Sequence, residues 1–180
     1  FYGRTISSMS AGGNKKHTTG FPTLDIFDHF EFGNYEQLKE KISNKTAAVL
    51  IEVIQGEQGL SKISDHSLKA IKDLCDQKEI LLICDETQSG FYRTSKFFSY
   101  QYANIQPHIV TFAKACANGV PFGGALMVEK VAKDADSNAK DAVAKDAVAK
   151  DAVAKNAVAK DAVAKDAVAK DAVAKDAVVI

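Results

Sequence analysis

The residues with the clearest chemical potential follow two short apolar runs of the sequence. The first run, residues 80–84, leads directly into Asp85, and the second run, residues 109–112, ends close to Lys114. Apolar runs of this length are typical of strands that are buried on both faces. If the two strands are parallel, Asp85, Gln88 and Lys114 lie together beyond their carboxyl ends, where open α/β sheets bind ligands.

The neighbours of Lys114 indicate amine chemistry at this place. They are all small, namely Ala113, Ala115, Cys116, Ala117, Asn118 and Gly119. A bulky group can therefore approach the lysine closely, and a partly desolvated lysine amine is a nucleophile toward aldehydes. Pyridoxal phosphate is the common aldehyde cofactor, and an acid such as Asp85 would keep its ring nitrogen protonated. Taken singly, a surface lysine and a strand-end aspartate are commonplace, whereas the combination with Gln88 and the glycine-rich residues 118–124 favours the cofactor.

Four motifs make the chain similar to the class III, fold type I, pyridoxal-phosphate-dependent aminotransferases. They are FYGRT at residues 1–5, EVIQGEQG at 52–59, LLICDETQSG at 81–90 and FAKACANGVPFGG at 112–124. The motifs stand in the family's order, and Asp85 and Lys114 are 114 − 85 = 29 positions apart, which suits the family. The resemblance covers roughly residues 1–133 and is nearest to the acetylornithine and ornithine aminotransferases.

The resemblance assigns four residues to the cofactor. Lys114 is the catalytic lysine, which binds pyridoxal phosphate covalently and later moves the proton. Asp85 protonates the ring nitrogen, Gln88 contacts the ring oxygen, and Phe1 stacks on the ring plane.

Two further residues are assigned to the substrate by the same resemblance. Arg4 binds a substrate carboxylate, which a guanidinium fork matches with two parallel hydrogen bonds. Taken alone, Arg4 would be interpreted as half of a surface ion pair. Glu57 gates the site by pairing with an arginine that belongs to a part of the family's chain not found in this sequence.

The resemblance also implies a reaction and its setting. The intact relatives are cytoplasmic transaminases of arginine biosynthesis, which move an amino group from acetylornithine or ornithine to 2-oxoglutarate and act as homodimers. The present chain begins inside a motif, so we expect it to be part of something longer, with weak cofactor binding because both phosphate-contacting loops of the family are missing. The alternative is a non-catalytic fragment, or an interaction piece with a helical tail.

Composition excludes several other functions. Lys plus Arg and Asp plus Glu each number 23, so the net charge is zero, which argues against nucleic acid or an anionic membrane as the main partner. The three cysteines fit no disulfide framework or zinc motif, which indicates a reducing setting. No pair of the four histidines has metal-ligand spacing, and no apolar run is long enough to cross a bilayer. A hydrolase pair of Asp85 and Glu86 is disfavoured, because adjacent strand residues point to opposite faces.

The pattern of apolar residues predicts an α/β fold. We expect helices at residues 35–42 and 65–78, the second with Asp65 as its N-cap, and strands at 47–54, 80–84, 109–112 and 122–128. The helix at 65–78 would join two parallel strands as a βαβ unit. Residues 1–131 are therefore predicted to be part of a three-layer, mostly parallel-sheet large domain of a pyridoxal-phosphate transferase.

Residues 132–180 form a second, repetitive region. From Ala139 the sequence contains eight copies of AKDAV, one with Asn156 in place of Asp, and a near copy, AKDAD, stands at 132–136. Alanine and the recurring acid-to-base pairs four residues apart favour a helix. Five residues turn a helix by about 500°, so apolar positions wind around all faces and no partner stripe forms. We therefore expect a solvated, semi-rigid helix.

Some positions depart from the family pattern. Phe91, Tyr92 and Ser95 stand where the family has smaller residues or glycine, and residues 116–118 lack the glycines that are common after the lysine. Non-glycine residues have less backbone freedom, so these loops should be harder to shape.

Overall fold

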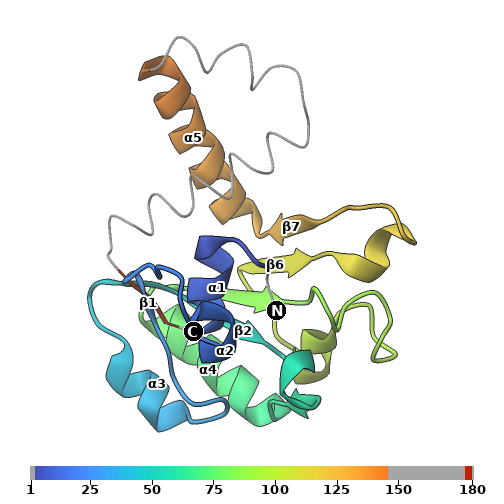
Figure 1. Ribbon diagram of the computed structural model, residues 1–180. Helices are drawn as coiled ribbons and strands as arrows, with labels where there is room; N and C mark the ends of the chain where they lie inside the picture. The colour runs from blue at the N-terminus through green and yellow to red at the C-terminus, as the bar shows by residue number, and fades with distance from the viewer. Residues whose placement is uncertain (1–2, 146–176, 180) are drawn as a thin grey trace.

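The computed structural model describes residues 3–145 and 177–179, and they form a mixed α/β architecture around one six-stranded sheet. The elements follow in the order α1 (Ile6–Gly12), α2 (Lys15–Thr18), β1 (Phe27–Asp28), α3 (Tyr35–Lys41), β2 (Thr46–Glu52), β3 (Ile54–Gln55), η1 (Gly56–Gln58), β4 (Ser61–Lys62), α4 (Asp65–Gln77), β5 (Leu81–Asp85), η2 (Ser99–Ala103), β6 (Ile109–Phe112), η3 (Lys114–Ala117), β7 (Gly124–Met127), α5 (Glu129–Lys145) and β8 (Ala177–Val179). The sheet order is β1-β8-β2-β5-β6-β7 (Figure 1). The α/β class with a mostly parallel sheet is confirmed.

Parallel pairing of β2, β5 and β6 forms the centre of the sheet. Glu52 of β2 pairs with Asp85 of β5, and Asp85 pairs in turn with Thr111 of β6. The edge strand β7 runs antiparallel to β6 and begins at Gly124, two residues later than expected. The chain therefore brings three polar residues to one level of the sheet, at the carboxyl ends of adjacent strands.

The helix α4 covers one face of this sheet. Leu68, Ile71, Leu74 and Cys75 are buried, as their helical spacing predicts. They belong to a core that includes Val49, Ile51, Leu82 and Cys84 of β2 and β5. The expected N-cap was wrong by one position: the Ser64 side chain, rather than Asp65, accepts the amide of Ser67. A short hydroxyl side chain before the first helical residue reaches that amide, whereas Asp65 is already helical.

The repetitive region has two described parts. The helix predicted from residue 132 begins earlier, at Glu129, and runs without a break to Lys145. Val131 and Ala135 are buried and anchor the start of α5, which then leads away from the sheet (Figure 1). The strand β8 differs from the helix expected for this region, because residues 177–179 pair in parallel with both β1 and β2. The repeats at 146–176 lie outside the described residues.

No helix in the described part of the chain is both long enough and apolar enough to cross a membrane.

The loop between β5 and η2 has an unusual backbone. Phe91, Tyr92 and Ser95 have φ angles of 58°, 63° and 67°, in the left-handed region that favours glycine. Two of these positions have compensating ring contacts: Phe91 lies 5.0 Å from the ring of Phe97, and Tyr92 lies 5.4 Å from it. Ser95 is exposed and has no ring to offset the strain. These three departures from the expected pattern thus fall on residues with a strained backbone.

Replacing Ser95 by glycine should stabilise the protein. The left-handed conformation costs roughly 1–2 kcal/mol for a residue with a Cβ, and the added freedom of glycine in the unfolded chain offsets about half of that gain. We expect the free energy of unfolding to rise by about 0.5–1 kcal/mol in urea titrations. Ser95→Ala is the matched control, because it keeps the Cβ and the strain. Equal stability of the two variants would contradict this interpretation.

His108 links the start of β6 to β5 and α4. Its Nδ1 atom accepts the amide of Leu82 at 2.8 Å, and its Nε2 atom lies 3.2 Å from a carboxylate oxygen of Asp76. Burial lowers the pKa of His108, and the charge of Lys72 lowers it further, whereas Asp76 opposes the shift. The hydrogen bond from Leu82 needs an unprotonated Nδ1, so the neutral imidazole is the form that fits the fold.

Acid should therefore weaken the fold through His108. A histidine with a lowered pKa in the folded state stabilises fully above its ordinary pKa of 6.5, and this stability is lost as the pH falls through that value and the folded pKa below it. We expect the urea midpoint to fall between pH 7.5 and pH 5.5, with about 1 kcal/mol of the loss due to the Leu82 bond. His108→Asn, whose side-chain oxygen can accept the same amide, should show a smaller fall. An identical pH dependence would refute this role for His108.

Candidate active site

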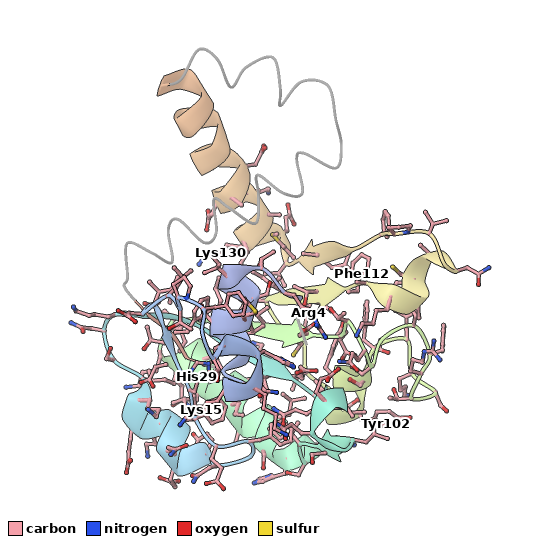
Figure 2. All side chains as sticks on the ribbon, viewed as in Figure 1. Arg4, Lys15, His29, Tyr102, Phe112 and Lys130 are labelled. Carbon is pink, nitrogen blue, oxygen red and sulfur yellow. The ribbon has the colours of Figure 1, made fainter. Side chains whose placement is uncertain are left out.

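The polar row at the carboxyl ends of the central strands borders a cavity. The cavity measures about 590 Å³, and Glu52, Glu57 and Asp85 line it together with residues of α1 and the loops around it. Gly13 and His29 close another part of the wall, where the His29 Nε2 atom lies 3.1 Å from the carbonyl oxygen of Ala11. In Figure 2, His29 lies beside the first two helices, which stand in front of the sheet.

Asp85 is held rigidly in the cavity wall. Its side chain is only 4% exposed, and one carboxylate oxygen accepts both the Thr111 hydroxyl and the Thr87 amide, each at 2.9 Å. Two donors on one oxygen fix the orientation of the carboxylate. A buried, oriented carboxylate of this kind can bind a cationic group of a ligand in the cavity.

Glu52 is a site residue that the sequence interpretation did not assign. Burial raises the pKa of Glu52, and the neighbouring Asp85 raises it further, while the charge of Lys114 acts in the opposite direction. Glu52, Asp85 and Lys114 are therefore electrostatically coupled across three strand ends. The signal that could have revealed Glu52 is its place at the end of an apolar run, equivalent to that of Asp85.

Lys114 lies at the first position of η3, directly beyond β6. Its side chain is exposed and it is not among the residues that line the cavity, although its charge reaches Glu52. Its φ angle is 49°, and Asn118 at the end of η3 also has a left-handed backbone. The structure thus brings Lys114 to the same edge of the sheet as Asp85, with its side chain exposed to solvent.

Gln88 and Glu57 meet above this edge. The Gln88 amide nitrogen lies 3.4 Å from a Glu57 carboxylate oxygen, although the two residues are 31 positions apart in the sequence. Gly56 makes the contact possible, because a Cβ at this position would lie 2.2 Å from the Gln88 side-chain oxygen. The QGE turn therefore packs its backbone directly against the Gln88 side chain.

The N-terminal motif is only partly described. Arg4 is exposed and lies just before Thr5, the residue whose hydroxyl caps α1 (Figure 2). Phe1 lies outside the described residues, so its predicted stacking stays a prediction. Arg4 is not one of the cavity-lining residues, whereas its neighbour Gly3 is.

The strand alternation separates Asp85 from Glu86. Asp85 bonds to Thr111 on the cavity face, whereas the Glu86 carboxylate bonds to Ser89 and Ser99, neither of which lines the cavity. A hydrolytic site built on both carboxylates would need them to face one bond. This geometry does not provide that arrangement.

Known proteins resemble the chain in both sequence and structure. The family described as Aminotransferase class-III matches residues 1–143. An acetylornithine aminotransferase of Methanocaldococcus jannaschii is 42% identical over 134 residues, which cover 74% of this chain and 34% of that protein. The chain spans about a third of the length of the curated relatives it matches.

Solved structures agree with this result. An ornithine aminotransferase from Toxoplasma gondii, described with partial occupancy of PLP at its active site, matches with a TM-score of 0.65 at 29% identity, over 71% of this chain and 30% of that one. An (S)-enantioselective omega-transaminase from Thermomicrobium roseum matches with a TM-score of 0.69 at 31% identity, over 76% of this chain and 36% of that one.

The packing of Gln88 against Gly56 can be tested without any ligand. Gly56→Ala should push the Gln88 side chain away from Glu57 and shift its side-chain amide signals in an NMR spectrum. The free energy of unfolding should change by less than about 1 kcal/mol, because the clash meets only the flexible end of a side chain. Gly12→Ala is the control, since a Cβ there meets nothing within 4 Å. Unmoved Gln88 signals in Gly56→Ala would show that the contact is absent in solution.

Proposed function

Because the chain belongs to the class III aminotransferase family, we propose that it forms part of a pyridoxal-phosphate-dependent aminotransferase. The reaction that the relatives' names support is transfer of an amino group from acetylornithine, or a similar amine, to a 2-oxo acid such as 2-oxoglutarate. The observation that carries the proposal is Asp85, a buried and oriented carboxylate in the cavity wall, on the strand beside the one that leads to Lys114.

The residues around the cavity suit this cofactor. Pyridoxal phosphate, when bound, supplies an aldehyde that takes up amino groups and a ring that accepts electrons from the substrate. Asp85 would hold the proton on the ring nitrogen, and its bonds to Thr111 and Thr87 keep the carboxylate aligned for that purpose. Lys114 would supply the amine that binds the aldehyde and then carry the proton between substrate atoms, for which its exposed side chain has room.

The remaining roles concern the ring and the substrate. Gln88 would contact the ring oxygen, and Phe1 would stack on the ring. Arg4 would bind a substrate carboxylate, and Glu57 would regulate access at the cavity wall. Supporting these roles, Gln88 lies against Glu57 and both approach the end of the strand that carries Asp85.

The assembly and setting are part of the same proposal. The protein would act as a homodimer in the cytoplasm, with an amino acid and a 2-oxo acid as its small-molecule partners. Exposed apolar side chains around β7, namely Val120, Phe122 and Leu126, offer surface that a second subunit could cover. Cys75, Cys84 and Cys116 are all free thiols, which suits a reducing compartment.

A second candidate is a non-catalytic protein that keeps the family fold. It is favoured by one observation, since Lys114 does not line the cavity that Asp85 borders. In that case an aldehyde bound in the cavity would not meet the Lys114 amine, and the protein would serve only to bind a ligand or another protein.

Cofactor binding separates the two candidates. We expect the purified protein mixed with pyridoxal phosphate to show a new visible absorbance band, which borohydride abolishes while leaving the cofactor attached to Lys114 in the peptide map. Lys114→Ala should lose the band, and Lys39→Ala, a change at an exposed lysine of α3, should keep it. A folded sample without the band, or with label spread equally over other lysines, would favour the non-catalytic candidate.

A further inference from the structure

Glu86 is a charged residue buried where the cavity does not reach. It is 1% exposed, and it is the only residue with an ionisable carboxylate among the largest fully buried side chains of the described structure. The preceding residue, Asp85, faces the cavity, so the two neighbouring acids stand on opposite faces of the sheet. A buried carboxylate without partners would be strongly unfavourable, so its surroundings must compensate the charge.

Three groups surround the Glu86 carboxylate with donors. The Ser99 hydroxyl lies 2.7 Å and 2.8 Å from its two oxygens, the Ser89 hydroxyl lies 2.5 Å from one of them, and the Tyr100 amide donates to the other at 2.9 Å. Charge-assisted hydrogen bonds of this kind are stronger than neutral ones. They join the residue that follows β5 to η2, and Glu86 and Tyr100 are 14 positions apart in the sequence.

The backbone of Glu86 is held as firmly as its side chain. Its amide donates to the Thr111 carbonyl oxygen at 2.8 Å, and its own carbonyl accepts the Gly90 amide at 2.9 Å. A Cβ at Gly90 would lie 2.8 Å from that carbonyl oxygen, so the chain passes too close for any side chain. Thr87 and Gln88 therefore lie in a tight turn. Glu86 begins this turn and is bonded to β6, and Gly90 closes it by donating to the Glu86 carbonyl oxygen.

This arrangement matters because the connecting loop stores strain. Phe91, Tyr92 and Ser95 adopt left-handed backbones inside the segment that the Glu86 bonds span. Such conformations persist only where the surrounding structure holds them. Without the carboxylate, the loop would be free to relax, and the turn after Asp85 would relax with it.

We propose that Glu86 is a positioning residue, whose buried carboxylate fixes the turn that aims Asp85 at the cavity and Gln88 at Glu57, a residue of the cavity wall. The effect of this positioning on bound pyridoxal phosphate rests on the function proposed above. The Thr87 amide is a direct reporter, since it donates to the carboxylate of Asp85.

Hydrogen exchange measured by NMR tests this role in the full chain. Glu86→Gln has nearly the same size but places an amide group among donors, so we expect exchange of the Thr87, Gly90 and Tyr100 amides to accelerate about tenfold. Ile71→Val, a change in the buried face of α4, is the control for a general loss of stability. It should accelerate exchange in α4 without selecting the three reporter amides.

A second readout concerns the cofactor. In protein saturated with pyridoxal phosphate, the pH midpoint of the visible absorbance change should move in Glu86→Gln and stay in place in Ile71→Val, because only the first variant disturbs the alignment of Asp85. A purely structural role would affect both variants according to their stability.

The outcomes separate this inference from the proposed function. Thr87 exchange that rises no more in Glu86→Gln than in Ile71→Val overturns the positioning role, even if the protein binds the cofactor. Selective acceleration supports the role, even if the unaltered protein takes up no cofactor and the proposed function fails. If Glu86→Gln does not fold, Ser99→Ala takes its place in the comparison with Ile71→Val. This variant removes one donor to the Glu86 carboxylate, so we expect exchange of the three reporter amides to accelerate by only about threefold.

Discussion

The register between β2, β5 and β6 is the constraint on which the site depends. Side chains alternate between the two faces of a sheet, so a shift of one residue in β5 would turn Asp85 toward α4 and Glu86 toward the cavity. The apolar residues Leu82 and Cys84 prevent that shift, because it would expose them on the cavity side. The core contacts with α4 therefore fix the chemistry on the opposite face of the sheet.

The two adjacent acids illustrate how surroundings assign roles to identical functional groups. Asp85 receives two donors on one oxygen and lines the cavity, so its carboxylate faces the space that a ligand would enter. Glu86 receives donors on both oxygens and is sealed from solvent, so its charge is directed entirely toward the protein. The sheet thus separates a carboxylate that can interact with a ligand from one that can only organise the chain.

The sequence was sufficient for the features that depend on local pattern. Short apolar runs located β5 and β6, and the helical spacing of Leu68, Ile71 and Leu74 located α4. It was insufficient where distant segments meet, since the coupling of Glu52 to Asp85 needs the strand register and the contact of Gln88 with Glu57 needs the QGE turn. The strand at residues 177–179 was missed for the same reason. Helix propensity is a local property of the repeats, whereas this strand forms because the distant edge of β2 is available for pairing with β-branched residues.

The position of β8 in the sheet also has a consequence for biosynthesis. Val178 pairs with Phe27 of β1, and the two residues are 178 − 27 = 151 positions apart. During translation, β1 and β2 emerge long before the strand that lies between them, so their facing edges wait unpaired until residue 179 has left the ribosome. Contacts of such long sequence separation form late, and an open edge can meanwhile pair with another nascent chain. The sheet is therefore most vulnerable to aggregation in the interval before synthesis reaches its last described strand.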